Sequence, residues 1–333
     1  FTENQASSSN NNNLFAIANL KAVYYPNLKD QWHFKTHFKT SQNSDDSFIE
    51  SITNSIENDL LIRENLKDSY FNQSIEWHRR SNAKNTLSFL ANYNYSSRSP
   101  KKQWQTSEGI LNEIIPVSED SLYNINNHLR TESNRFDTQF KYYWLINRNH
   151  HFYSTIGNTL QYQNFFSEDF QILQDGSMNS FSNSGFGNNF RFNLNDLFIG
   201  VNYKVQLGIF KLNQGVFLHN YNWKTSQGNE TTRSKTVLLP NFSAKAKFSR
   251  TKILQFDYEL TSSFSEASRY ARDFYINSYN SVFRGNNSLE NELINNFKLR
   301  ISKYSTYRGI RLFVTVNYKN KIKGIINRID YIN

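Results

Sequence analysis

The chain has 333 residues, of which 38% are hydrophobic and 16% aromatic, with a mean hydropathy of -0.70, a formal charge of +10 and no cysteine. The lack of cysteine excludes a disulfide framework and a thiolate metal site, and no apolar run reaches the roughly 18 residues that a membrane-spanning helix needs. The aromatic content argues against disorder, because disordered chains are poor in aromatic residues.

The beginning of the chain is polar and of low complexity. Residues 1–13 predict a loop, and Phe1 is neither an initiating methionine nor followed by a secretion signal, so we expect a mature or partial polypeptide. Alternation of apolar and polar side chains then predicts strands over 14–25, 31–40, 69–79 and 86–95.

Residues 41–68 depart from this alternation. Apolar side chains recur there at intervals of four, at Phe48, Ile52, Ile56 and Leu60, and Ser47 and Glu50 have the spacing of a capping box. The segment therefore predicts a loop with a short helix, packed over the mouth of a barrel or against a partner protein.

The clearest hairpin covers residues 134–166. Phe136, Phe140 and Trp144 alternate with the polar Asp137 and Lys141, and a polar turn at 147–150 reverses the chain into a second alternating arm. Each arm is long enough for a tilted transmembrane strand, which needs about 9–11 residues. Further strands are predicted over 197–205, 212–223, 242–248, 254–264, 293–301 and 312–318.

The connections between these roughly dozen strands alternate in length. Short turns lie near 28, 82, 148, 209, 251 and 307, and long loops near 54, 114, 178, 229 and 278. An up-and-down barrel has short turns at one rim and long loops at the other. We predict an all-β, antiparallel, up-and-down transmembrane β-barrel, multi-pass in the outer membrane; a soluble β-protein whose aromatics fill a core is the alternative.

Aromatic residues gather toward the ends of the predicted strands, as expected for girdles at the two membrane interfaces. The candidate lipid-facing or girdle residues are Trp32, Phe34, Trp77, Phe89, Tyr93, Phe136, Phe140, Tyr142, Trp144, Tyr221 and Trp223. Lys and Arg are scattered over strands and turns, so nucleic acid is not expected. They could meet lipopolysaccharide phosphates or an anionic cargo at the rims, or simply solvate loops.

No catalytic, metal or cofactor site is predicted. His33 and His37 share a strand face but lie about 13 Å apart, too far for one metal ion. Acidic pairs at 45–46, 119–120 and 168–169 lack the spacing of a calcium loop, and Ser177 lacks the flanking glycines of a nucleophile elbow. We do not expect an enzyme.

Two stretches, 238–275 and 279–304, resemble the barrel domain of TonB-dependent outer-membrane receptors. The family motif would comprise Arg284, Gly285, Asn286, Leu289 and Glu292, within a long loop over 265–291, and Asn291 stands where the family usually has proline. The resemblance implies a Gram-negative outer-membrane protein with a 22-stranded barrel, an N-terminal plug and a segment that contacts TonB. Neither plug nor segment is recognisable, so residues 1–333 are expected to be one partial barrel domain.

Three functions follow as hypotheses. The first is a TonB-dependent receptor that imports a metal chelate, glycan or peptide, with lipid, lipopolysaccharide, the TonB complex and possible surface lipoproteins as partners. The second is a structural or docking barrel in a larger envelope assembly, suggested by the expected helix at 41–68. The third hypothesis is a soluble β-rich binding protein.

Overall fold

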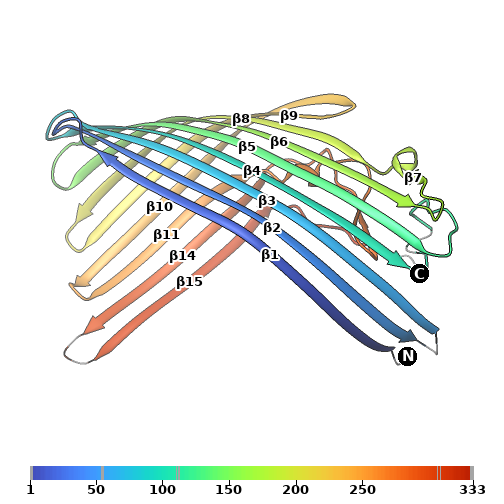
Figure 1. The fold of residues 1–333 in the computed structure, drawn as a ribbon. Coiled ribbons are helices and arrows are strands. Elements are labelled where there is room, and N and C mark those ends of the chain that lie inside the picture. Colours follow the sequence, from blue (N-terminus) through green and yellow to red (C-terminus); the bar gives the residue numbers. More distant parts are fainter. Residues whose placement is uncertain are drawn as a thin grey trace.

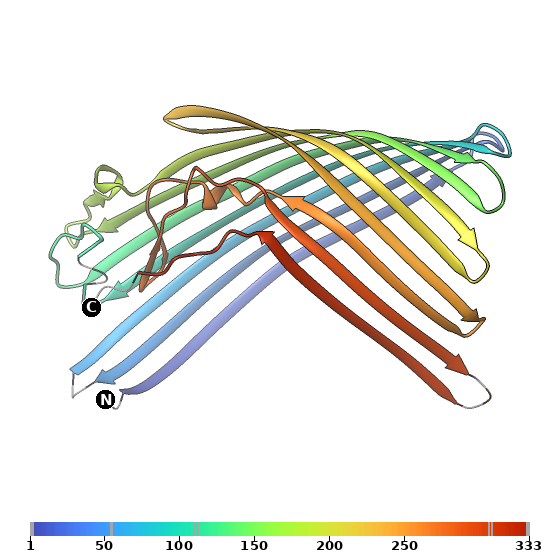
Figure 2. The ribbon, with the colours of Figure 1, turned by 180° about the vertical axis from the view of Figure 1, so that it is seen from behind.

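A computed structural model describes residues 3–53, 56–109, 111, 113–305, 307 and 309–330. It contains one large antiparallel sheet that arches like part of a barrel wall (Figures 1 and 2). The long strands are β1 (Glu3–Tyr24), β2 (Asp30–Thr53), β3 (Ile56–Arg80), β4 (Asn85–Thr106), β5 (Tyr123–Leu145), β6 (His150–Ile172), β8 (Asn188–Leu207), β9 (Phe210–Gln227), β10 (Asn229–Ser249), β11 (Lys252–Ser263), β14 (Glu292–Ser305) and β15 (Ile310–Lys323).

These twelve strands pair in sequence order, each antiparallel to the next, which confirms the predicted up-and-down topology. The sheet is not closed, and β1 and β15 form its two edges. The short β7 (Met178–Ser180) pairs with β6, while β12 (Tyr275–Ser278) and β13 (Ser281–Phe283) form a separate hairpin. The remaining elements are two 3-10 helices, η1 (Ser182–Ser184) and η2 (Ala267–Arg269).

Several predicted loops are strands instead. Residues 3–13 belong to β1, and residues 41–53 and 56–68 extend β2 and β3, so the predicted helix over 41–68 is wrong. An interval of four is even, so it also places residues on one face of a strand. The hydroxyl group of Ser47 donates to Oδ2 of Asp45 at 3.1 Å and does not cap a helix.

The predicted long loop near 229 is also wrong, because only Gly228 separates β9 from β10. Long connections are found over 107–122, 173–187 and 264–291, all at the rim opposite the short turns (Figure 1). The predicted alternation of short and long connections therefore holds for three of the loops, while the other strand pairs extend as long hairpins.

Paired residues on neighbouring strands form rows whose side chains all lie on the same face of the sheet. Phe140 pairs with Ile156, and the same row continues through three further strands to Ile199, Leu218 and Leu238. All five side chains are at least 39% exposed and lie on the convex, outer face. The neighbouring rows, such as Lys141 paired with Thr155, face the concave side. One face is thus apolar and exposed, and the other is largely polar.

The polarity of each face changes along the strands. Toward the long-loop rim the outer face changes from apolar to polar, and the inner face of β8 becomes apolar. In β8 the buried apolar residues Phe190, Phe192 and Leu194 face inward, whereas Leu197 and Ile199 face outward and are 53% and 56% exposed. Toward the long-loop rim, the outer positions of β2 to β5 become polar, apart from the pair Phe48 and Leu61. In β5, residues 136–144 carry the apolar outer stretch, roughly 30 Å along the strand or about 23 Å at a tilt of about 40°. This matches the apolar band of about 25 Å on transmembrane barrels.

Aromatic rings lie across from glycines on the inner face. Phe198 pairs directly with Gly157, and Phe217 with Gly200. A Cβ at Gly200 would lie 2.1 Å from Cδ1 of Phe217, and one at Gly157 would lie 2.4 Å from Cζ of Phe198. Each ring therefore lies flat over a neighbouring strand because that strand has no side chain there, an arrangement that helps to pin the register.

We predict that Gly200→Ala destabilises the sheet by about 1–3 kcal/mol, because the added methyl group overpacks against Phe217. Urea unfolding in detergent micelles measures this. In a Phe217→Ala background the same change should cost much less, since the clash is gone. An equal cost in both backgrounds would show that the ring does not occupy the space above Gly200.

Candidate functional site on the inner face

The connection between β11 and β14, residues 264–291, starts and ends at the long-loop rim and folds back under the arch of the sheet (Figure 2). We call this segment the inner loop. It contains η2, β12 and β13, and it packs on the inward-facing side chains of β6, β8, β9 and β10. The predicted long loop over 265–291 is therefore folded and docked.

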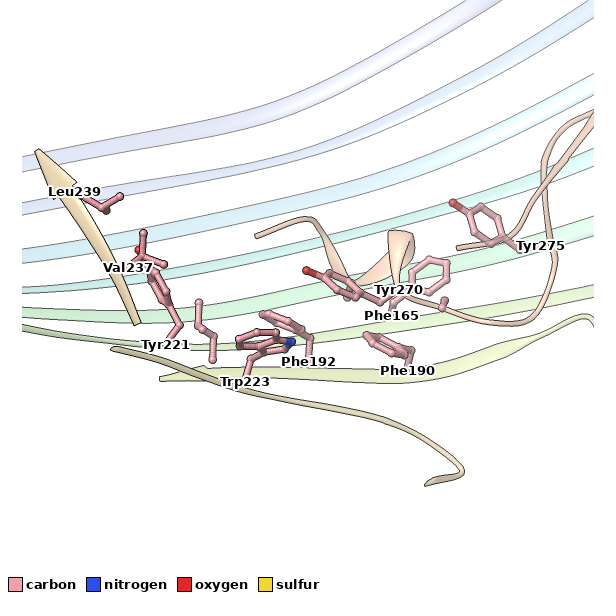
Figure 3. Packing of buried hydrophobic residues seen from close by; sticks show 12 residues of the cluster. Phe165, Phe190, Phe192, Tyr221, Trp223, Val237, Leu239, Tyr270 and Tyr275 are labelled. Carbon is pink, nitrogen blue, oxygen red and sulfur yellow. The ribbon is translucent and has the colours of Figure 1, made fainter. Parts of the chain in front are cut away.

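Stacked aromatic rings hold the inner loop on the sheet (Figure 3). Tyr270 is fully buried and stacks on Phe190 and Phe192, with ring centroids 6.0 and 5.1 Å apart. Phe264 packs on Trp223, with centroids 5.2 Å apart. The inner face is apolar here because it is covered by protein, not because it meets lipid.

Amide side chains of the sheet bind the backbone of the inner loop. Gln227 accepts the N–H of Arg272 at 2.8 Å, and Asn188 accepts the N–H of Asp273 at 3.1 Å. Gln163 accepts a third loop N–H, at 2.8 Å. A loop packed against a sheet must satisfy its backbone polar groups, and these amides do so where no strand pairing is available.

A second apolar cluster joins the inner loop to the other long connections. It consists of Trp104, Ile115, Ile125, Phe181, Phe186 and Ile276. Gln171, fully buried, accepts the N–H of Ser118 at 2.8 Å and donates to its carbonyl at 2.9 Å. The three connections therefore form one packed layer at this rim.

Asp169 lies buried at the junction of these clusters. Its Oδ1 accepts from Nδ2 of Asn127 at 2.6 Å and from the backbone N–H of Ile276 at 3.3 Å. Burial raises the pKa of Asp169 from its ordinary value of 3.8 to about 7, against the opposing effect of these two hydrogen bonds. The carboxyl therefore titrates near neutral pH at the contact that fixes β12.

The residues of the predicted family motif shape the return of the inner loop. The N–H of Gly285 donates to the carbonyl of Ala271, and that of Asn286 to the carbonyl of Arg269, both at 2.8 Å. A Cβ at Gly285 would lie 2.3 Å from the carbonyl oxygen of Arg269. Glycine is needed here because two backbone segments touch.

The other motif residues have separate contacts. Arg284 lies over the ring of Phe274, 4.8 Å from its centroid, and the side chain of Asn286 accepts the N–H of Ser288 at 2.9 Å. Leu289 packs against the cluster around Tyr270. Glu292, the first residue of β14, accepts the N–H of Ile325 at 2.8 Å, the contact that contributes most to lowering its pKa.

The predicted girdle aromatics divide into two groups. Register places Trp32, Phe34, Trp77, Phe89, Tyr93, Phe136, Phe140, Tyr142 and Trp144 on the outer face. Tyr221 and Trp223 are instead 4% and 3% exposed on the inner face, under Phe264, so their prediction is wrong. They pair with Asp196 and Leu194 of β8, on the long-loop side of Leu197, where the inner face is apolar.

The structure shows two further features of the described ranges. No three His, Cys, Asp or Glu side chains gather closely enough there to hold a metal ion. The helices of this part of the chain include none with the length and apolar character that a bilayer crossing requires.

The residues that dock the inner loop were missed from the sequence. One signal was available, since Phe190, Phe192 and Leu194 alternate directly after the predicted loop, in the opposite parity to Leu197 and Ile199. The amides Gln163, Asn188 and Gln227 carried no such signal, because isolated amides are common on any polar strand face.

An arched up-and-down sheet with an apolar outer band is typical of outer-membrane β-barrels. Comparison with solved structures finds the fold of the barrels of TonB-dependent outer-membrane receptors, as the resemblance of 238–304 predicts. The ferric-catecholate import receptor Fiu from E. coli K12 matches with a TM-score of 0.51 and 10% identity, covering 95% of this chain and 57% of Fiu. The siderophore receptor PiuA from Acinetobacter baumannii matches with a TM-score of 0.52 and 9% identity, covering 95% of this chain and 56% of PiuA.

These identities establish a shared fold alone, and the chain spans a little over half the length of both receptors. No protein-family model and no curated protein matches the sequence.

We predict that Tyr270→Ala loosens the inner loop, with a loss of about 3–5 kcal/mol for removing a fully buried ring. Tyr270→Phe keeps the stack on Phe190 and Phe192 and serves as the matched control. Hydrogen exchange of residues 264–291 in the purified protein measures the effect. Equal protection in both variants would mean that the stack does not hold the loop.

We predict that the inner loop is docked more firmly at about pH 5 than at about pH 8. Between pH 3.8 and about 7 the folded chain keeps a proton on Asp169 that the unfolded chain has released. The contribution of Asp169 to the free energy of unfolding therefore falls as the pH rises through this window.

Exchange of the Ile276 amide, corrected for its intrinsic pH dependence, provides the measurement. Asp169→Asn should remove most of the difference between the two pH values. A difference that survives in this variant would assign the effect to another group.

Proposed function

We propose that the chain is part of the wall of a TonB-dependent outer-membrane receptor that imports a nutrient such as a metal chelate, glycan or peptide. The observation that carries the proposal is the exposed apolar band on the outer face combined with an inner face that is polar and partly covered by a folded loop. A porin-like pore would not need the packed layer formed by the three long connections at one rim.

The proposed partners follow from this placement. The outer band would meet lipid, and basic residues toward the rims would meet lipopolysaccharide phosphates or an anionic cargo. Contact with the TonB complex would require a plug, and surface lipoproteins are further candidate partners. The fold shared with Fiu, described as an import receptor, and with PiuA, described as a siderophore receptor, supports the proposal at the level of architecture.

The alternative of a docking barrel rested on a helix over 41–68, and the structure has strands there. No other observation favours that function over import.

Deletion of the gene tests import directly. We expect slower growth when one nutrient is limiting, and we expect loss of TonB in the same strain to add no further defect in uptake of that nutrient. Sedimentation of the protein with the inner membrane or the soluble fraction would overturn the proposal.

We predict that Phe140→Arg lowers the stability of the protein in lipid by about 2–4 kcal/mol if the residue lies near the bilayer midplane, because a guanidinium group would enter hydrocarbon. Gln139→Arg is the matched control, since the neighbouring side chain faces inward. Urea titration of folding into phospholipid vesicles measures both. Similar losses for the two variants would show that the outer face does not contact lipid.

A further inference from the structure

A pocket of about 630 Å³ lies between the inner loop and residues 324–330. Three arginines line it, Arg269, Arg284 and Arg328, together with the rings of Phe274 and Phe283. We call it the arginine pocket. Its volume falls within the range of about 300–1,000 Å³ that is usual for small-molecule sites.

The backbone holds the two segments that carry Arg269 and Arg284 next to each other. The N–H of Asn286 donates to the carbonyl of Arg269 at 2.8 Å, so the residue after Gly285 is hydrogen-bonded to the position that bears one guanidinium group. The other guanidinium group, of Arg284, lies over Phe274. Arg269 also donates to the side chain of Asn327 at 3.2 Å, which ties the far wall of the pocket to the near one.

The carboxylates closest to these two arginines are hydrogen-bonded to lysines, although Arg269 also contributes to lowering the pKa of Glu292. Glu290 accepts from Lys235 at 2.9 Å and from Lys323 at 2.6 Å, and the two lysines lower the pKa of Glu290 to about 2. Glu292 accepts from Lys321 at 3.1 Å.

Within the described residues, neither Arg269 nor Arg284 forms an ion pair with a carboxylate, whereas Arg328 pairs with Asp330 at 2.9 Å. Glu290 and Glu292 are thus bound to lysines, Asp330 is paired with Arg328 within the pocket, and an excess of positive charge from Arg269 and Arg284 is left at its wall.

We propose that the arginine pocket binds an anionic ligand with an apolar body, whose carboxylate or phosphate groups contact Arg269 and Arg284 and whose body packs on Phe274 and Phe283. Planar guanidinium groups match both kinds of anion in two-pronged hydrogen bonds. A pocket lined by one sign of charge also concentrates the oppositely charged ligand. The inference rests on the proposed import function and narrows its cargo to anions.

Isothermal titration of the intact protein in detergent tests the pocket with three probes. Benzene-1,3,5-tricarboxylate supplies charge and an apolar body, pyrophosphate supplies charge alone, and benzene-1,3,5-trimethanol supplies a neutral body of similar shape. We expect the tricarboxylate to bind most tightly, pyrophosphate more weakly, and the neutral triol not to bind. Tighter or equal binding of the triol would overturn the proposal, as would no binding of either anion.

Variants locate the binding. Arg269→Gln and Arg284→Gln should each weaken tricarboxylate binding by about tenfold, as expected when a charge-assisted hydrogen bond is lost. Arg284→Lys, which keeps the charge, should retain more affinity than Arg284→Gln. Arg148→Gln removes an exposed arginine at the opposite rim and should have no effect. Equal affinities for all four variants and the unaltered protein would overturn the assignment.

These measurements need neither TonB nor an energised membrane. Anion binding at the pocket without any uptake defect on gene deletion would sink the import function alone. An uptake defect without anion binding would sink the pocket alone.

Discussion

Every other feature of this protein depends on the antiparallel register of neighbouring strands. Directly paired residues face the same side of a sheet, and a slip by one residue would reverse the facing of a whole strand. The row from Phe140 to Leu238 shows the result, since one outward direction is kept through five strands. The rings of Phe198 and Phe217, which fit only over Gly157 and Gly200, add a steric check on the same alignment.

The register also explains why one strand serves two environments. Outward residues must suit the proposed lipid over part of a strand and water beyond it, while inward residues must suit water first and the docked loop beyond it. In β8 the change occurs between Leu194 and Leu197. The rings around Tyr270 and the amides that bind the loop backbone lie on the rim side of this change. In β10, however, Val237 and Leu239 of the same cluster flank the outward-facing Leu238, so the packed inner layer and the outer apolar band overlap in part.

Much of this fold was predictable from the sequence, because period-two alternation is strong in segments such as 134–166 and 242–248. The strand extensions were not, since residues such as Gln42 and Ser97 continue strands whose outer face has become polar, which removes the usual contrast between faces. The apparent helix at 41–68 arose because an interval of four fits both periodicities. Tyr221 and Trp223 were assigned to the wrong face because aromatic content alone does not distinguish lipid from a covering loop.

The way in which the inner loop is anchored has a consequence for motion. Gln163, Asn188 and Gln227 and the rings beneath Tyr270 all belong to β6, β8 and β9, three successive neighbours in one uninterrupted stretch of sheet. The inner loop is therefore fixed in position relative to the sheet. If the protein works by opening and closing a passage, the mobile parts must lie elsewhere, and a passing solute would move alongside a surface whose shape stays constant through the cycle.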